Sequence, residues 1–235
     1  MRLLKSKLFV LLYCFVFLCA MAVCYGLDQA VTTAAAQPGF GGRTVIVIDA
    51  GHGGIDGGAT AVNGKLESHI NLQIALRLQD LMHLLGYDTY MIRTTDTSIY
   101  TEGNTIASQK VSDLKNRVRI VNETANCLLI SIHQNTYPDS RYAGAQVFYG
   151  KTEECKAFAS TMQTALNTAL CPNNQRQIKS SKGIYLMENI EKCGVLIECG
   201  FISNPQDASN LCSEAYQMKL CSVIAATTAC FKANT

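Results

Sequence analysis

Two runs of hydrophobic, largely β-branched residues in this chain each end next to a histidine. The first run, Val45–Ile48, leads through a glycine-rich turn to His52, and the second, Leu128–Ile132, is followed directly by His133. Apolar runs of this kind are typical of strands that are buried on both faces of a sheet. Because ligands of open α/β sheets bind at the carboxyl ends of the strands, we expect the two imidazoles to meet at one edge if the strands are neighbours.

The rest of the pattern alternates between helix and strand. Apolar residues at helical spacing predict helices over residues 67–85, 111–121, 151–170 and 213–231, and short apolar runs predict strands over 87–92, 145–149, 184–187 and 195–199. Gly86 is a natural helix stop, and the polar residues 94–110 predict a surface loop. Strand–helix–strand successions favour parallel pairs. We therefore predict a single α/β domain, a three-layer sandwich whose mostly parallel mixed sheet has helices on both faces.

Composition supports one domain and excludes one class of partner. The chain has 235 residues, of which 48% are hydrophobic, which is enough for a sizeable core and one domain preceded by a leader. The formal net charge is only +2, and no dense basic run lies beyond the N-terminus. Nucleic acid is therefore not an expected partner.

The first 26 residues have the pattern of an export signal. Basic residues precede the apolar stretch Leu8–Val23, and Ala20–Ala22 supplies an A-x-A-like cleavage site. The apolar stretch is long for a signal peptide and short for a membrane span, so an uncleaved anchor that would associate the protein with the membrane stays open. A lipid-modified Cys24 is a weaker alternative. All three interpretations place the protein outside the cytoplasmic membrane, secreted or anchored.

Residues 27–42 are predicted to form a linker, and residues 43–235 the single folded domain. Eight of the eleven cysteines lie in this domain, where an even number and an exported context permit disulfides. Cys127 and Cys199, however, fall in or beside apolar strand patterns, where cysteine behaves as a small hydrophobe. No C-x-x-C pair occurs. We interpret most of the cysteines as buried thiols, leave a bridge open, and do not expect a cysteine metal site.

Two glutamates occupy positions that suit a metal site. Glu67 begins the first predicted helix, and Glu198 ends an apolar run just before a glycine turn. An acidic residue at a helix start also stabilises the helix dipole by about 0.3–1 kcal/mol, so its position alone does not make Glu67 a ligand. Ionised carboxylates are rarely buried without a partner. A catalytic zinc needs three protein ligands, an open position and a nearby carboxylate to move protons.

Four strings of residues together resemble the zinc-dependent N-acetylmuramoyl-L-alanine amidases, the amidase_3 family, over about residues 44–231. The strings are Ile48–Gly54, Glu67, Ser131–Asn135 and Ile197–Pro205. The resemblance implies Zn²⁺ as cofactor, with His52, Glu67 and His133 as metal ligands and Glu198 as catalytic acid/base. It also implies hydrolysis of the amide between the muramoyl lactyl group and L-alanine of peptidoglycan. We assign Asn135 as a substrate-binding residue.

Three further strings resemble the single-domain amidases of the spore cortex: Ser112–Asn122, Gly144–Tyr149 and Ile184–Leu186. This resemblance implies that the chain trims stem peptides ahead of muramic-δ-lactam formation, which marks cortex for breakdown at germination. Peptidoglycan is the expected partner, and no protein partner is predicted. Ala50 and Cys199 depart from the family pattern, as does His69, whose position close to Glu67 makes it an alternative third ligand.

Two other classes of function stay open. A metal-free glycosidase could use a carboxylate pair such as Asp56 and Glu198, but it leaves the paired histidines unexplained. A non-catalytic peptidoglycan-binding or scaffold protein could keep the fold without the chemistry. Retention of His52, Glu67, His133 and Glu198 argues against that alternative.

Overall fold

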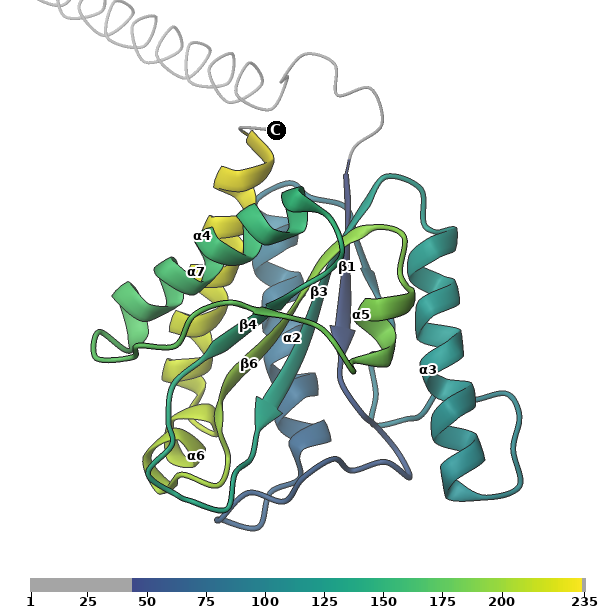
Figure 1. Ribbon diagram of the computed structural model, residues 1–235, viewed down its shortest axis with the longest axis horizontal. Coiled ribbons are helices and arrows are strands. Elements are labelled where there is room, and N and C mark those ends of the chain that lie inside the picture. The colour runs from purple at the N-terminus through teal and green to yellow at the C-terminus, as the bar shows by residue number, and fades with distance from the viewer. Residues whose placement is uncertain (1–43, 234–235) are drawn as a thin grey trace, which may run out of the picture. The chain divides into compact units, whose positions relative to one another are not determined.

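The computed structural model of the protein describes residues 44–233 (Figure 1). The predicted leader and linker, residues 1–42, lie outside the described residues. The strands are β1 (Val45–Ala50), β2 (Thr89–Met91), β3 (Cys127–Asn135), β4 (Gln146–Tyr149), β5 (Lys179–Ser180) and β6 (Cys193–Phe201). The helices are α2 (Glu67–Leu84), α3 (Ile106–Glu123), α4 (Glu153–Leu170), α5 (Tyr185–Asn189), α6 (Pro205–Leu211) and α7 (Glu214–Ala233).

The strands form one mixed sheet in the order β2-β1-β3-β6-β4-β5. The pairs from β2 to β6 are parallel, β4 runs antiparallel to β6, and β5 is parallel to β4. The carboxyl ends of β1, β3 and β6 therefore lie side by side at one edge. The two histidine strands are neighbours, so the condition for the imidazoles to meet at one edge is fulfilled. The predicted mostly parallel mixed sheet is confirmed.

Successive residues of each central strand point to opposite faces of the sheet, and each face has its own hydrophobic core. Ile46, Ile48 and Ile130 belong to the core that contains residues of α2, α4 and α7. Val47 and Leu129 belong to the core that contains residues of α3 and α5. Figure 1 shows the two groups of helices on opposite sides of the sheet. This arrangement confirms the predicted three-layer sandwich.

The strand register lines up three polar side chains on the face that α3 and α5 cover. His133 on β3 is the Cα partner of Glu198 on β6, and Glu198 is the partner of Gln146 on β4. Residues opposite each other in register share a face of the sheet. Leu196, two residues before Glu198, belongs to the core on the α3 and α5 side, which identifies the face.

One predicted strand is wrong. Residues 184–187 enter helix α5, in which Leu186 and Met187 are buried and Tyr185 is exposed. A four-residue apolar run cannot distinguish a strand from a short buried helix by its periodicity. The sequence also indicates a turn at Cys193 and Gly194 between the two apolar runs, and this prediction is wrong because both residues lie in β6. The short elements β5 and α6 were not predicted.

Helix α3 begins earlier than its apolar pattern indicates. It starts at Ile106, inside the predicted loop, because Thr105 and Ser108 form a capping box that satisfies the first backbone N–H groups. The predicted stop of α2 at Gly86 is confirmed, since that residue has a φ of 81° just after the helix end. None of the helices within residues 44–233 is long and apolar enough to cross a membrane.

The eight cysteines of the described residues are all free thiols. Cys127, Cys155, Cys199 and Cys221 are buried, so the prediction of mostly buried thiols holds for half of them.

The packing of the core on the α3 and α5 side predicts that truncating a buried leucine and truncating an exposed one will have different effects on the free energy of unfolding. Leu129→Ala removes a fully buried side chain, so we expect the free energy of unfolding to fall by about 2–5 kcal/mol. Leu84→Ala is the matched control, because Leu84 is 81% exposed and its truncation should change stability by less than about 0.5 kcal/mol. Urea unfolding followed by circular dichroism measures both. Equal losses in the two variants would contradict the assigned packing.

Candidate metal and catalytic site

The chain turns sharply where β1 ends, and this turn presents His52. His52 has a φ of 61°, in the left-handed region that non-glycine residues rarely adopt. The next two residues, Gly53 and Gly54, also have positive φ angles, 134° and 57°. Gly51 has a different constraint: a Cβ atom there would lie 2.2 Å from Nε2 of His133. Only glycine at residue 51 lets the His133 ring lie against the end of β1.

Two buried arginines hold the carbonyl groups of the turn. Arg117 donates from Nη1 to the Ala50 oxygen at 3.0 Å and from Nη2 to the His52 oxygen at 2.7 Å. Arg93 donates from Nε to the Ala50 oxygen at 2.8 Å and from Nη2 to the Gly51 oxygen at 2.9 Å. These bonds satisfy backbone acceptors at and just beyond the end of β1, and they fix the strained turn.

Arg117 is itself held by carboxylates. Its Nη1 donates to Oδ1 of Asp49, and its Nε donates to Oδ2 of Asp113 at 2.6 Å. Ser131 on β3 donates to the second Asp49 oxygen at 2.6 Å. Burial alone would raise the pKa of Asp49, but Arg117, with His133 and Ser131, holds that pKa below its usual range. The charge pair therefore stays ionised in the core and ties the turn to β1, β3 and α3.

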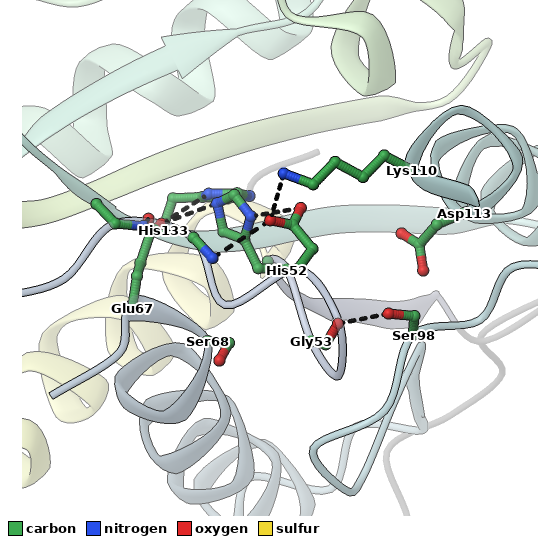
Figure 2. A network of polar contacts seen from close by, with 12 residues as sticks. His52, Gly53, Glu67, Ser68, Ser98, Lys110, Asp113 and His133 are labelled. Carbon is green, nitrogen blue, oxygen red and sulfur yellow. Dashed lines mark hydrogen bonds and ion pairs between the residues drawn. The ribbon is translucent and has the colours of Figure 1, made fainter. Parts of the chain in front are cut away.

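Three candidate ligand atoms converge on the edge of the sheet (Figure 2). Oε1 of Glu67 lies 3.3 Å from Nε2 of His52 and 3.1 Å from Nδ1 of His133. All three ligand atoms lie within 4.8 Å of one another. Backbone N–H groups of Ala59 and Gln134 donate to the two Glu67 oxygens, each at 3.1 Å, and hold the carboxylate in place. The geometry brings together the three predicted ligands.

The electrostatics of the three groups favour a cation between them. Burial lowers the pKa of His52, but hydrogen bonds and charges from Glu67 and Asp56 outweigh it and raise that pKa to about 9. Burial likewise opposes ionisation of Glu67, yet His133 and His52 hold its pKa well below the usual range. A metal ion can take the place of the proton that balances Glu67.

The spacing and chemistry of the donors fit a small tetrahedral metal ion. Bonds of about 2.0–2.2 Å at tetrahedral angles separate neighbouring ligand atoms by roughly 3.3–3.6 Å. The distances of 3.1 and 3.3 Å are close to that range. Asp56 accepts a hydrogen bond from Nδ1 of His52 at 2.9 Å, which leaves Nε2 facing the centre, and Lys110 pairs with the other Asp56 oxygen at 2.7 Å. Carboxylates commonly orient metal-binding histidines in this way.

Glu198 lies beside the three ligands without bonding to them. It is the register partner of His133, and its Oε2 is buried with no hydrogen-bond partner among residues 44–233. Burial raises the pKa of Glu198 to about 7, Glu67 adds to the rise, and His133 opposes it. A carboxylate whose pKa lies near neutrality can both accept and return a proton.

The remaining candidates are placed differently. His69 is half-exposed, and its Nε2 lies 2.9 Å from Oδ2 of Asp96. Within residues 44–233, the cluster of candidate ligand atoms consists of His52, Glu67 and His133 and does not include His69. The side-chain oxygen of Asn135 accepts a hydrogen bond from the Thr136 backbone at 2.8 Å. The role of Asn135 in substrate binding stays a prediction.

A cavity of about 280 Å³ adjoins the histidines. The residues that line it include His52 and His133, Lys110 on α3, and residues 183–186 at the start of α5. The cavity gives a substrate access to the site from the face that α3 and α5 cover.

Sequence reasoning missed the residues that support the site. Asp49, Arg93 and Arg117 received no role, and Asp56 was considered only as half of a glycosidase pair. Two signals were available, because the string Ile48–Gly54 includes Asp49 and the string Ser112–Asn122 includes Arg117. The contact between Arg117 and Asp49 joins residues 68 positions apart, so no local pattern reveals it.

Comparison with known proteins gives consistent matches. The family described as N-acetylmuramoyl-L-alanine amidase matches residues 46–228. The germination-specific N-acetylmuramoyl-L-alanine amidase of Bacillus subtilis is 42% identical over 183 residues, covering 77% of this chain and 76% of that protein.

Solved structures agree with the sequence matches. The CwlD amidase from Clostridioides difficile, solved in complex with the GerS lipoprotein, superposes with a TM-score of 0.79 and 34% identity, over 82% of this chain and all of that chain. An N-acetylmuramoyl-L-alanine amidase from Clostridium difficile 630 gives a TM-score of 0.71 and 25% identity, over 82% of this chain and 98% of that chain.

Gly51→Ala tests the packing of the histidine ring against β1. The new methyl group would displace the His133 ring, so we expect metal affinity to fall at least about tenfold, because ligand positions must hold to a few tenths of an ångström. Gly57→Ala is the matched control in the same loop, since its Cβ would meet only the flexible end of Leu66 at 3.2 Å. Competition with a chromogenic chelator measures both affinities. Unchanged affinity in Gly51→Ala would contradict the geometry.

Proposed function

The chain belongs to the N-acetylmuramoyl-L-alanine amidase family, and we propose that its substrate is the peptidoglycan of the spore cortex. Its reaction is hydrolysis of the amide between the muramoyl lactyl group and L-alanine of the stem peptide. The observation that carries the proposal is the convergence of His52, Glu67 and His133 beside the unpartnered carboxylate of Glu198. The likeness to a germination-specific relative supports the cortex as the source of substrate.

The two other classes of function explain less of the site. The Asp56 carboxylate bonds to His52 and Lys110, which accounts for it without an acid/base pair for glycan cleavage. A scaffold protein would not need a carboxylate with a pKa of about 7, that of Glu198, next to three side chains that can bind a metal ion. We therefore set the glycosidase and the scaffold aside.

We propose zinc as the ion that His52, Glu67 and His133 hold. Bound there, zinc would polarise the scissile carbonyl and acidify a water molecule. Glu198 takes a proton from the attacking water as the new C–O bond forms, and then delivers that proton to the nitrogen of the departing L-alanine as the C–N bond breaks. Asp56 keeps the His52 ring in one orientation throughout.

We also propose that the protein works outside the cytoplasmic membrane, where its substrate lies. The leader pattern of residues 1–26 supports export. The Clostridioides difficile amidase was solved in complex with a lipoprotein, and we propose that a lipoprotein also binds this chain. Export is tested by fusing residues 1–42 to a reporter that is active only after export; a fusion protein that is made but stays in the cytoplasm with an inactive reporter would contradict it.

The direct test of the function is the analysis of digested cortex peptidoglycan by mass spectrometry. The purified protein should release free stem peptides and leave the glycan strands uncut. A chelator should stop the release, and added zinc should restore it. Glycan fragments that appear regardless of chelator would overturn the proposal in favour of a glycosidase.

Glu198→Gln separates catalysis from metal binding. Glutamine is nearly isosteric but cannot accept the proton, so we expect turnover to fall by about 10²–10⁴-fold while metal content stays at the wild-type level. The rate of stem-peptide release and the metal content of the same preparation give the two readouts. Near-normal turnover by a metal-loaded variant would show that Glu198 is only a structural hydrogen-bonding group.

Metal affinity should depend on pH. Below about pH 9 the metal-free protein carries a proton on His52 that the ion must displace. Affinity should therefore fall by about tenfold for each pH unit below that value, until further groups titrate. Asp56→Asn removes one group that raises the pKa of His52, so affinity should become constant at a lower pH. Chelator competition between pH 6 and 9 measures this; a flat profile would contradict it.

A further inference from the structure

We propose that Arg176 is a specificity-determining residue, which binds the free carboxylate on the second residue of the departing stem peptide. The inference rests on the proposed function, because it assigns a partner within the same substrate. It comes from an arginine that lies beside the catalytic row of side chains and whose charge no carboxylate of the described residues neutralises.

Arg176 is placed on the catalytic face by the sheet register. Glu198 and Gln146 are cross-strand partners, so their side chains point to the same face of the sheet. Arg176 donates from Nη1 to Oε1 of Gln146 at 3.1 Å. His133, Glu198, Gln146 and Arg176 therefore follow one another across β3, β6 and β4, with Arg176 at the far end.

The guanidinium group of Arg176 is oriented but not fully used. It lies 4.4 Å from the ring centre of Phe201, and its Nε donates to the Ala143 oxygen at 3.2 Å. No ion pair joins Arg176 to a carboxylate within residues 44–233, and no hydrogen bond from its Nη2 is found there. Of its five N–H groups, the two bonds found leave others available.

Other arginines of the described segment differ in this respect. Arg117 is paired with Asp49 and Asp113, and Arg141 is paired with Asp139. Arg93 has no ion pair but directs its guanidinium nitrogens to four backbone carbonyl groups. Unlike these three arginines, Arg176 has a guanidinium group that stacks on a ring, carries a charge that no carboxylate of the described residues balances, and keeps unused N–H donors.

The distance suits the second residue of the stem peptide. Neighbouring strands lie about 4.8 Å apart, so Gln146 on β4 lies roughly 10 Å from His133 on β3. An extended peptide advances roughly 3.3 Å per residue, so the second residue after the scissile bond reaches about 7 Å and its carboxylate lies farther out. In peptidoglycan this second residue is D-glutamate joined through its side chain, which leaves its α-carboxylate free. A guanidinium group matches a carboxylate with two parallel hydrogen bonds.

A purely structural role is the competing explanation. Stacking on Phe201 and bonding to Gln146 could serve only to hold the connection between α4 and β5 against the sheet. If Arg176 has only that role, replacing it should lower the stability of the protein and reduce the hydrolysis of all substrates by the same factor. Specific recognition would affect only substrates that carry the carboxylate.

The experiment compares two soluble muropeptides that are identical except at the second residue, which is D-glutamate in one and its α-amide in the other. We expect the wild-type protein to prefer the acid. In Arg176→Gln, kcat/KM for the acid should fall by about ten- to hundredfold, mainly through KM, because a charge-assisted hydrogen bond is lost. Hydrolysis of the amide should change by less than about twofold, with metal content and Tm unchanged.

Two further variants make the test decisive. Arg141→Gln is the matched control, because Arg141 lies in the neighbouring connection and is exposed and paired with Asp139; it should alter neither substrate. Arg176→Lys keeps the charge and should retain part of the preference for the acid, and it serves if Arg176→Gln does not fold. Equal losses on both substrates, or no loss on either, would overturn the assignment. A wild-type protein that hydrolyses neither muropeptide would instead defeat the proposed function itself, and this inference with it.

Discussion

The buried pair between Arg117 and Asp49 is the interaction on which the site depends. The same guanidinium group that neutralises Asp49 also binds the carbonyl groups of Ala50 and His52, which belong to a turn with left-handed backbone geometry. Breaking a buried charge pair by removing one partner typically costs about 3–5 kcal/mol, because the other charge stays in the core. The strain at His52 is tolerated because this network stabilises the turn.

Side chains alternate between the two faces of the sheet along each strand, and this alternation separates the residues of the hydrophobic core from the polar residues of the site. On the central strands, residues of one parity fill the core under α2, α4 and α7, while Asp49, His133 and Glu198 point to the other face. That face is only partly covered, by α3 and the short α5, and the adjoining cavity opens there. The fold thus gives the polar row both a rigid base and access to substrate.

Much of the site could be predicted because its residues terminate strong local patterns. The histidines follow buried strands, and Glu67 follows a glycine-rich loop at a helix start, so hydrophobic periodicity places all three at the ends of elements. Their assignment as metal ligands came from the family resemblance. The strand over residues 184–187 was wrong because so short an apolar run fits a helix equally well. Arg117 and Arg93 could not be assigned, because their partners lie tens of residues away and only the folded chain brings them together. The role of Asp56 depends on the orientation of one ring, which sequence does not encode locally.

The claim that two imidazoles and one carboxylate hold zinc at this edge of the sheet is tested most directly by X-ray absorption at the zinc edge of the metal-loaded protein. The eight free cysteines of the described residues offer an alternative set of ligands, so the type of donor atom is the decisive quantity. The structure predicts a first shell of nitrogen and oxygen atoms at about 2.0–2.2 Å with imidazole scattering beyond it. A first shell that contains sulfur at about 2.3 Å would contradict the account.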